Sequence, residues 1–260
     1  MNAVAIIPAA GRGERLGAHL PKTLVELRGR PVIVHTLAVF ERVAGISGVI
    51  LVVPPEFVDV YRRVVERYGM PKVLAVVAGG ATRTCSVRNG LSALPSEADY
   101  VVVHDGARPL VTVATVERGL HLALQAKALV AAVPVKPTIK VVDPATQVIR
   151  QTLDRSLLWE IQTPQIFERA LLERAYADGA EATDDAALVE RLGVPVKVFP
   201  GDYDNLKITT PGDMPLAEAL LAREESLGLR SPASRPVKQK EKSARRGGKR
   251  RPGSIKNGED

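Results

Sequence analysis

Glycines and cations follow the first apolar run of the chain. The segment 8–17 reads PAAGRGERLG, and Pro21 and Lys22 come shortly after it. Small residues let backbone N–H groups approach a ligand closely, and amide groups turned into a concavity bind anions. Arg15 and Lys22 add positive charge at the same place. This pattern predicts either a polyphosphate site or a plain glycine-rich turn with two surface cations.

The spacing of these glycines excludes two common phosphate-binding loops. A dinucleotide fingerprint needs glycines spaced G-x-G-x-x-G, and here the third glycine comes one residue late. A P-loop needs Gly-Lys followed by Ser or Thr after its four intervening residues, and that sequence does not follow. The segment therefore belongs to neither loop type.

A second glycine-containing segment, 79–87, reads GGATRTCSV and follows the apolar run 72–78. The glycine pair permits a sharp turn into the next helix. Ser86 and the backbone around Gly80 could then contact the edge of a base. The alternative is a strand-to-helix turn with a capping hydroxyl.

The segment 104–109 reads HDGARP and ends a further apolar run. Asp105 could hold Mg²⁺, which needs one or two protein carboxylates when phosphate oxygens supply other ligands. The alternative is an ion pair between Asp105 and Arg108 that stabilises the turn. We expect His104 to be a packed residue at the end of a strand.

These segments lie between elements that alternate between strand and helix. We expect strands at 3–8, 48–53, 72–78, 99–104, 195–199 and 205–209. We expect helices at 31–43, 56–68, 85–94, 113–126, 167–177, 184–192 and 211–226. Alternation of this kind predicts an α/β fold, a mostly parallel sheet flanked by helices. Ligands of such sheets bind beyond the carboxyl ends of the strands, where the glycine-containing segments fall.

The alternation changes near residue 134. Two β-branched runs flank Asp143, Pro144, Ala145 and Thr146, a turn-type cluster. We expect a β-hairpin arm at about 134–155. An isolated hairpin is marginal in water, so it should pack on something else, and a partner subunit is the natural candidate.

The composition of the chain limits the kinds of protein that it can be. The chain is 45% hydrophobic, and no apolar run approaches about 18 residues, so we expect a globular protein that does not enter a membrane. Cys85 is the single cysteine, which fits a reducing compartment, and we expect a cytoplasmic protein.

The net charge of +7 lies in the last 30 residues. Residues 231–260 hold ten Lys or Arg and three acidic residues, whereas residues 1–230 hold 26 of each sign. We expect a folded domain over 1–230 and a basic, disordered tail over 231–260. The tail has no interleaved aromatic residue for stacking, so we expect no specific nucleic-acid partner.

Several segments together resemble a known enzyme family. They are the run A-A-G-x-G-x-R-x-G with P-K downstream, G-G-x-x-R-x-x-S-V, HDGARP and D-N-x-K at 204–207. In this order and spacing they resemble the 2-C-methyl-D-erythritol 4-phosphate cytidylyltransferases of the non-mevalonate isoprenoid pathway. The family's block at 104–109 more commonly has alanine where this chain has Gly106.

The resemblance implies a Rossmann-like nucleotidyltransferase fold and transfer of CMP from CTP to methylerythritol phosphate, with Mg²⁺ or another divalent cation. It implies that the charges acting on the phosphates are Arg15, Lys22 and Lys207. It implies that CTP is bound by Ala9, Ala10, Gly11, Gly80, Ser86, Asp105 and Gly106. It implies that the second substrate is bound by Asp105, Arg108, Thr138, Arg155 and Thr183, and that Asp105 holds the metal.

The resemblance also implies a homodimer. The hairpin would be the dimerisation arm, and its Thr138 and Arg155 would reach the substrate of the neighbouring subunit. Taken without the resemblance, Thr183 belongs to an ordinary helix-capping cluster and Lys207 is a surface residue.

Other activities stay open at this point. A related cytidylyltransferase acts on ribitol 5-phosphate and shares the nucleotide half, so the polyol pocket alone separates the two. A nucleotidyltransferase for another base is a second alternative.

Overall fold

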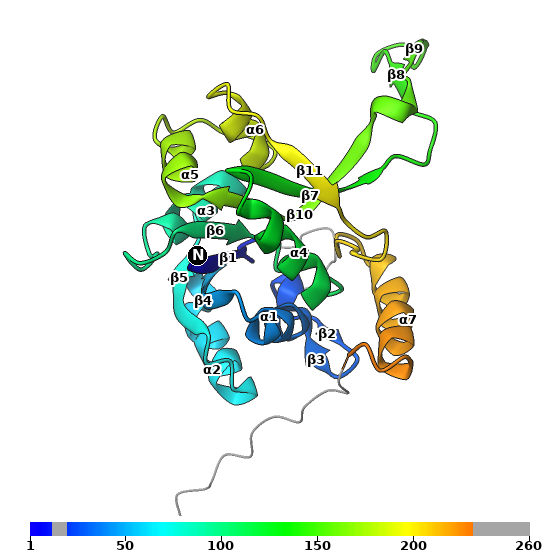
Figure 1. Cartoon of the computed structure of the whole chain (residues 1–260). Coiled ribbons are helices and arrows are strands. Elements are labelled where there is room, and N and C mark those ends of the chain that lie inside the picture. The colour runs from blue at the N-terminus through cyan, green and yellow to red at the C-terminus, as the bar shows by residue number, and fades with distance from the viewer. Residues whose placement is uncertain (12–19, 231–260) are drawn as a thin grey trace, which may run out of the picture.

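The computed structural model describes residues 1–11 and 20–230, which are built around one seven-stranded sheet (Figure 1). The strand order is β11-β7-β10-β6-β1-β4-β5. β10 runs antiparallel to β6 and β7, and the other neighbouring strands of this sheet are parallel. The predicted α/β fold with a mostly parallel sheet is confirmed.

The strands of this sheet are β1 (Ala3–Pro8), β4 (Ile46–Val53), β5 (Val73–Ala78), β6 (Tyr100–Val103), β7 (Ala128–Pro134), β10 (Trp159–Glu168) and β11 (Lys197–Pro200). The helices are α1 (Val32–Arg42), α2 (Val58–Tyr68), α3 (Arg83–Leu91), α4 (Val113–Ala123), α5 (Arg169–Tyr176), α6 (Asp185–Glu190) and α7 (Asp213–Ser226).

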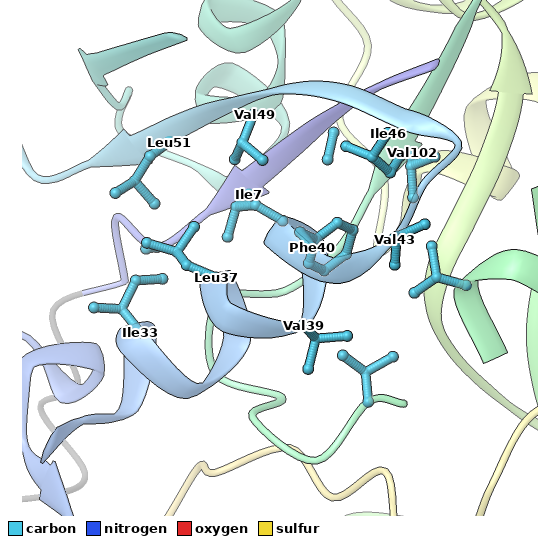
Figure 2. Packing of buried hydrophobic residues seen from close by; sticks show 14 of the residues in the cluster. Ile7, Ile33, Leu37, Val39, Phe40, Val43, Ile46, Val49, Leu51 and Val102 are labelled. Atoms are coloured by element: carbon cyan, nitrogen blue, oxygen red, sulfur yellow. The ribbon is translucent and has the colours of Figure 1, made fainter. Parts of the chain in front are cut away.

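Alternating residues of β1 face the two sides of the sheet. Ile7 packs in one apolar cluster with Phe40 of α1, and this cluster also takes in residues of α2 and α4 (Figure 2). Ile6 packs in a second cluster with Val87 of α3, together with residues of α5 and α6. Because both faces are buried, the central strands are continuous apolar runs, which made them recognisable in the sequence.

A third, smaller cluster joins α7 to a two-stranded hairpin of β2 (Glu26–Leu27) and β3 (Arg30–Pro31). The buried members of this cluster include Leu27, Leu110, Ile208 and Leu221. Ile208 lies beside Lys207, so this cluster anchors the loop that carries that lysine.

The predicted arm is present. β8 (Lys140–Val142) and β9 (Ile149–Thr152) pair antiparallel at its tip, which extends away from the sheet beyond the ends of β7 and β10 (Figure 1). Asp143 begins the turn, and its Oδ1 accepts from the backbone N–H of Ala145 and Thr146. The short polar turn predicted between the two runs is therefore confirmed.

Two expectations about elements were incomplete or wrong. The segment 205–209 forms no strand; Ile208 N–H donates to Ala107 O at 2.8 Å, while the Ile208 side chain is buried beside α7. Its apolar character reflects this burial and not strand pairing. The strands β7 and β10 were not predicted. Buried polar residues such as Gln162 and Gln165 interrupt the apolar pattern by which a buried strand such as β10 would be recognised.

Within residues 1–11 and 20–230, no helix has the length and apolar character needed to cross a membrane. The expected tail at 231–260 lies outside the described residues.

Candidate active site

Two hollows open at the carboxyl ends of the central strands. The first has a volume of about 870 Å³ and lies between the segments that follow β1 and β5. The second has a volume of about 480 Å³ and lies between β10 and the start of α6. Both hollows are lined by Arg83, Asp105 and Lys207. Two ligands in these hollows would therefore meet at one acidic and two basic side chains.

The first hollow brings together most of the residues expected to bind a nucleotide. Its lining includes Ala9, Ala10, Gly11, Lys22, Gly80, Ser86, Asp105 and Lys207. These residues come from five separate stretches of the sequence, which the fold brings together at one edge of the sheet. The lining combines small neutral residues and backbone with the cations Lys22, Arg83 and Lys207.

The glycine pair after β5 is required by close packing. A Cβ atom on Gly79 would lie 2.5 Å from the Cβ of Ala10, and one on Gly80 would lie 2.4 Å from the Cβ of Cys85. Both separations are too short for real side chains, so a larger residue at position 79 would clash with the 8–11 segment and one at position 80 would clash with α3. Gly79 thus lets the 8–11 segment lie close to the end of β5, and Gly80 lets the chain turn tightly into α3.

Ser86 holds the turn between β5 and α3. Its Oγ accepts from Gly80 N–H at 3.1 Å and donates to Thr82 O at 2.8 Å. Thr82 caps α3 by accepting from Cys85 N–H at 3.0 Å. A hydroxyl oxygen has two lone pairs, so Ser86 keeps one acceptor position beyond this turn.

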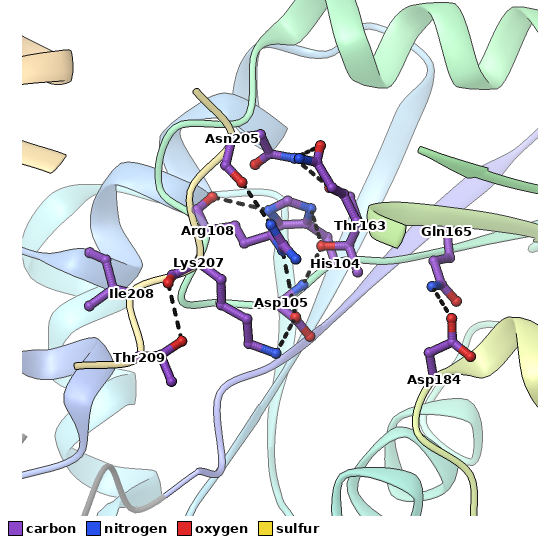
Figure 3. Close-up of polar contacts among 12 residues, drawn as sticks. His104, Asp105, Arg108, Thr163, Gln165, Asp184, Asn205, Lys207, Ile208 and Thr209 are labelled. Atoms are coloured by element: carbon purple, nitrogen blue, oxygen red, sulfur yellow. Dashed lines mark hydrogen bonds and ion pairs between the residues drawn. The ribbon is translucent and has the colours of Figure 1, made fainter. Parts of the chain in front are cut away.

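Asp105 lies just past the end of β6 and is the acidic centre of the site (Figure 3). Its Oδ2 is 2.7 Å from Lys207 Nζ and 3.8 Å from Arg108 Nε, and its Oδ1 is 3.2 Å from Arg83 Nε. Burial raises the pKa of Asp105, but Arg83 and then Lys207 outweigh it and hold the pKa well below its usual range. Asp105 is therefore ionised at neutral pH.

His104 is buried next to Asp105 and orients the site through hydrogen bonds (Figure 3). Its Nε2 lies 3.2 Å from Arg108 O, which can only accept, so neutral His104 carries its proton there. Its Nδ1 then accepts from Thr163 Oγ1 at 3.0 Å. Thr163 Oγ1 also accepts from Asp105 N–H at 3.1 Å. Burial lowers the pKa of His104 to about 4, which agrees with the packing role expected for it.

The loop that carries Lys207 is fastened to the turn after β6. Arg108 Nη1 donates to Asn205 O at 2.7 Å, and Asn205 Nδ2 donates to Thr163 O at 2.8 Å. Lys22 Nζ donates to Ile208 O at 3.1 Å. The lysine therefore reaches Asp105 from a loop that is fixed on both sides, and it is not the plain surface residue that its sequence context alone suggests.

The second hollow contains Arg108, Thr163 and Thr183, together with Gln165 and Asp184. Asp184 caps α6, because its Oδ1 accepts from the backbone N–H of Ala187 at 3.0 Å. Its Oδ2 accepts from Gln165 Nε2 at 2.9 Å (Figure 3). The capping cluster predicted from the sequence is thus present, with Asp184 as its cap and Thr183 at the hollow.

The donors near Asp105 suit a metal ion that arrives with a ligand. Among the described residues, Asp105 is the single carboxylate that lines both hollows, and no group of three or more His, Cys, Asp or Glu side chains could hold a metal. Mg²⁺ bound to a polyphosphate needs only one or two protein carboxylates. The residues therefore fit a metal carried by the phosphates and not one bound by the protein alone.

Four of the expected site residues are placed elsewhere or are not placed. Gly106 is buried and lines neither hollow; a Cβ there would lie 3.0 Å from Ile33 Cδ1 and 3.1 Å from Ala9 Cβ. Thr138 and Arg155 are exposed on the arm and line neither hollow of this chain. Arg15 lies outside the described residues.

Sequence reasoning missed two residues of the site. Arg83 lines both hollows, and Thr163 holds His104 and the backbone of Asp105. Arg83 was visible inside the segment 79–87, but its acidic partners lie far along the chain, and a single sequence gives no sign of that pairing.

Comparisons with known proteins agree with this arrangement. The family model of IspD, 2-C-methyl-D-erythritol 4-phosphate cytidylyltransferase, matches residues 3–223. A relative with that name from Geobacillus thermodenitrificans is 46% identical over 226 residues, which cover 85% of this chain and 98% of the relative.

Solved structures agree as well. The crystal structure of 4-diphosphocytidyl-2C-methyl-D-erythritol synthase from Anaerococcus prevotii matches with a TM-score of 0.74 at 33% identity, over 85% of this chain and 98% of that one. The structure of 2-C-methyl-D-erythritol 4-phosphate cytidylyltransferase from Thermus thermophilus matches with a TM-score of 0.68 at 37% identity, over 86% and 100%. The resemblance found in the sequence is thereby confirmed, and the chain belongs to the 2-C-methyl-D-erythritol 4-phosphate cytidylyltransferase family.

Proposed function

We propose that this chain transfers CMP from CTP to 2-C-methyl-D-erythritol 4-phosphate, giving 4-diphosphocytidyl-2-C-methyl-D-erythritol and pyrophosphate. The observation that carries the proposal is the junction of two hollows at Arg83, Asp105 and Lys207. A transfer between two phosphorylated substrates needs adjacent pockets with positive charge where the phosphates meet. The larger hollow suits the nucleotide and the smaller one suits the polyol phosphate.

The reaction is a direct displacement at the α-phosphorus. An oxygen of the 4-phosphate forms the new P–O bond, and the bond to the pyrophosphate oxygen breaks, so the electron pair leaves with pyrophosphate. A phosphate dianion is already a nucleophile and needs no general base, which agrees with the buried, neutral state of His104. The protein contributes position and charge, which are large terms in such transfers.

Lys22, Lys207 and Arg15 stabilise the negative charge that develops on the transferring and leaving phosphates. Lys22 and Lys207 line the first hollow, and Lys207 also lines the second, so it can contact both substrates. Asp105 is the residue that would hold Mg²⁺, and the ion would neutralise triphosphate oxygens when bound. Because Asp105 already binds Lys207, the ion would share that carboxylate with the lysine.

Cytosine binds in the first hollow beside its small uncharged residues. Gly80 and the free acceptor position of Ser86 lie there, and the 9–11 segment supplies small residues against which the nucleotide can lie. Gly106 supports this segment from beneath, since its Cα leaves room for Ala9. Arg108 and Thr183 bind the polyol phosphate in the second hollow.

The arm completes the second hollow of a partner subunit in a homodimer. Thr138 and Arg155 are exposed on it, and Arg155 Nη1 is held by Lys136 O at 2.9 Å. The arm also exposes the large apolar side chains Val141, Val142, Val148 and Ile149, and Leu157, Trp159 and Ile161 are exposed in the segment that follows it. Exposed apolar surface on a protruding hairpin favours burial against another chain.

We also propose that residues 1–230 form the catalytic unit, that the basic tail is dispensable for turnover, and that the protein acts in the cytoplasm. The single Cys85 suits the reducing environment there.

Substrate selection tests the proposed function. Pyrophosphate release is measured with CTP, UTP, ATP and GTP, each offered with 2-C-methyl-D-erythritol 4-phosphate or with ribitol 5-phosphate. The proposal predicts the highest kcat/KM for CTP with methylerythritol phosphate. A higher kcat/KM for ribitol 5-phosphate, or for another nucleotide, would replace it.

A further inference from the structure

Arg83 joins two carboxylates that are far apart in the sequence. Its Nε lies 3.2 Å from Oδ1 of Asp105, at the end of β6. Its Nη1 and Nη2 donate to Oδ1 and Oδ2 of Asp185, the first residue of α6, at 3.1 and 2.7 Å. The guanidinium therefore spans the gap between the sheet and the helix that borders the second hollow.

Asp185 holds the Arg83 guanidinium in one orientation. The Asp185 side chain is fully buried and lines neither hollow. Besides the fork from Arg83, it accepts from Tyr176 O–H at 2.5 Å. A planar guanidinium bound at both nitrogens of its fork cannot rotate freely, so Asp185 fixes the orientation of Arg83.

Arg83 in turn limits how Asp105 can lie. One oxygen of the Asp105 carboxylate contacts Arg83 and the other contacts Lys207. Because both oxygens are engaged, a change at Arg83 changes the plane of the carboxylate and with it the position of the Lys207 ammonium group. Arg83 also lines both hollows with a side chain that is 25% exposed.

We infer that Arg83 is a positioning residue, anchored by Asp185, that holds Asp105 and Lys207 in the geometry needed for transfer. The inference rests on the proposed function, since it concerns the same site. Asp185 contributes to turnover through Arg83, although it touches neither substrate pocket. Lysine can replace the arginine only in part, because one ammonium group cannot bind both oxygens of Asp185 in a fork and reach Asp105 as well.

A double-mutant cycle tests the inference. Wild type, Arg83→Gln, Asp185→Asn and the double variant are compared for kcat and for the KM of each substrate, with thermal unfolding recorded for each protein. We expect Arg83→Gln to lower kcat by about 10²-fold and Asp185→Asn to lower it by about 10-fold, as misplacement of catalytic groups does. Since Asp185 acts through Arg83, the double variant should be no slower than Arg83→Gln.

The KM values separate positioning from general damage. Arg83→Gln should raise the KM of both substrates, because Arg83 borders both hollows. Partial unfolding would lower the apparent kcat and leave both KM values unchanged. Arg83→Lys should recover only part of the loss. Arg62→Gln is the control; its guanidinium pairs with Asp59 on the exposed side of α2 and lines neither hollow, so kcat should stay near wild type.

Two results would overturn the inference. One is a folded Arg83→Gln protein with wild-type kcat and KM values. The other is an Asp185→Asn loss that multiplies with the Arg83→Gln loss in the double variant, which would give Asp185 an independent structural role. Should Arg83→Gln fail to fold, wild-type kinetics in folded Asp185→Asn would overturn it equally. Wild-type turnover in the same assay tests the proposed function by itself. If the wild type is active and only the variants lose activity, the loss concerns the role of Arg83.

Discussion

The Nζ of Lys207 lies 2.7 Å from Oδ2 of Asp105, and this contact stands where the two hollows meet. It joins the loop that follows β11 to the end of β6. In the proposed reaction the same lysine faces the phosphates of both substrates. The aspartate keeps the cations of the site together before any phosphate arrives.

Removal of the Asp105 charge should weaken both the fold and the reaction. Asp105→Asn leaves Arg83, Arg108 and Lys207 without their shared counter-charge. Breaking a buried ion pair on one side costs about 3 kcal/mol in the free energy of unfolding. Turnover should fall by about 10²-fold, as for loss of a preorganised charge. Urea unfolding at neutral pH and steady-state kinetics measure the two effects.

Asp143→Asn is the control, because Asp143 pairs with Arg150 on the exposed arm. Its urea midpoint should match wild type. An Asp105→Asn protein as stable as wild type would show that the cations around it need no common partner.

Much of this fold could be predicted from the sequence, because the central strands are buried on both faces and are therefore continuous apolar runs. Sequence reasoning found β1, β4, β5 and β6, and it found the polar residues at their ends. It missed β10, where Gln162 and Gln165 are buried yet satisfied by partners distant in the chain, such as Asp202 O and Asp184. The pairing of Arg83 with Asp185 escaped it for the same reason. Such contacts depend on the assembled fold and leave no local pattern.

The arm should carry catalytic residues between subunits. Lys22→Ala and Arg155→Ala should each lower turnover by about 10²–10³-fold. In a mixed dimer of the two variants, one site has both defects and the other has neither. Random mixing should therefore restore about a quarter of wild-type turnover, measured after the two proteins are refolded together.

The matched control mixes Lys22→Ala with Lys207→Ala. Both lysines line the same hollow of one chain, so no mixed site is intact and turnover should stay low. If the Lys22→Ala and Arg155→Ala mixture shows no recovery, the arm does not cross between subunits.

His35 should make the fold less stable in mild acid. Burial lowers its pKa from 6.5 to about 4, and its Nε2 donates to Leu27 O at 2.7 Å. Between these two pH values the unfolded chain binds a proton that folded His35 does not, so stability falls as pH drops through this window. Well above pH 6.5 His35 is neutral in both the folded and the unfolded chain, so it no longer changes the free energy of unfolding.

The measurement is the free energy of unfolding by urea across this pH window. His35→Gln can still donate to Leu27 O and should show a shallower loss than wild type. His104, whose pKa is also lowered to about 4, contributes to the slope that remains. Equal slopes in the two proteins would contradict the buried, neutral state of His35.

Removal of residues 231–260 should leave turnover unchanged. The truncation is placed after Arg230 because its Nη2 donates to Val111 O at 2.9 Å and its Nε pairs with Glu224. A second truncation that also removes Arg230 should lower the thermal midpoint, since Glu224 is then buried without its partner. Kinetics and thermal unfolding of the two truncated proteins test this; a large loss of turnover in the first would give the tail a part in catalysis.

The most direct test of the account is the identity of the product. Enzyme, CTP, Mg²⁺ and 2-C-methyl-D-erythritol 4-phosphate are incubated together, and the mixture is followed by phosphorus NMR. The proposed reaction gives two coupled signals from a diphosphate that links cytidine to the polyol, with one pyrophosphate formed for each diphosphate product. The appearance of free CMP or CDP in place of that diphosphate, with the methylerythritol phosphate unchanged, would contradict it.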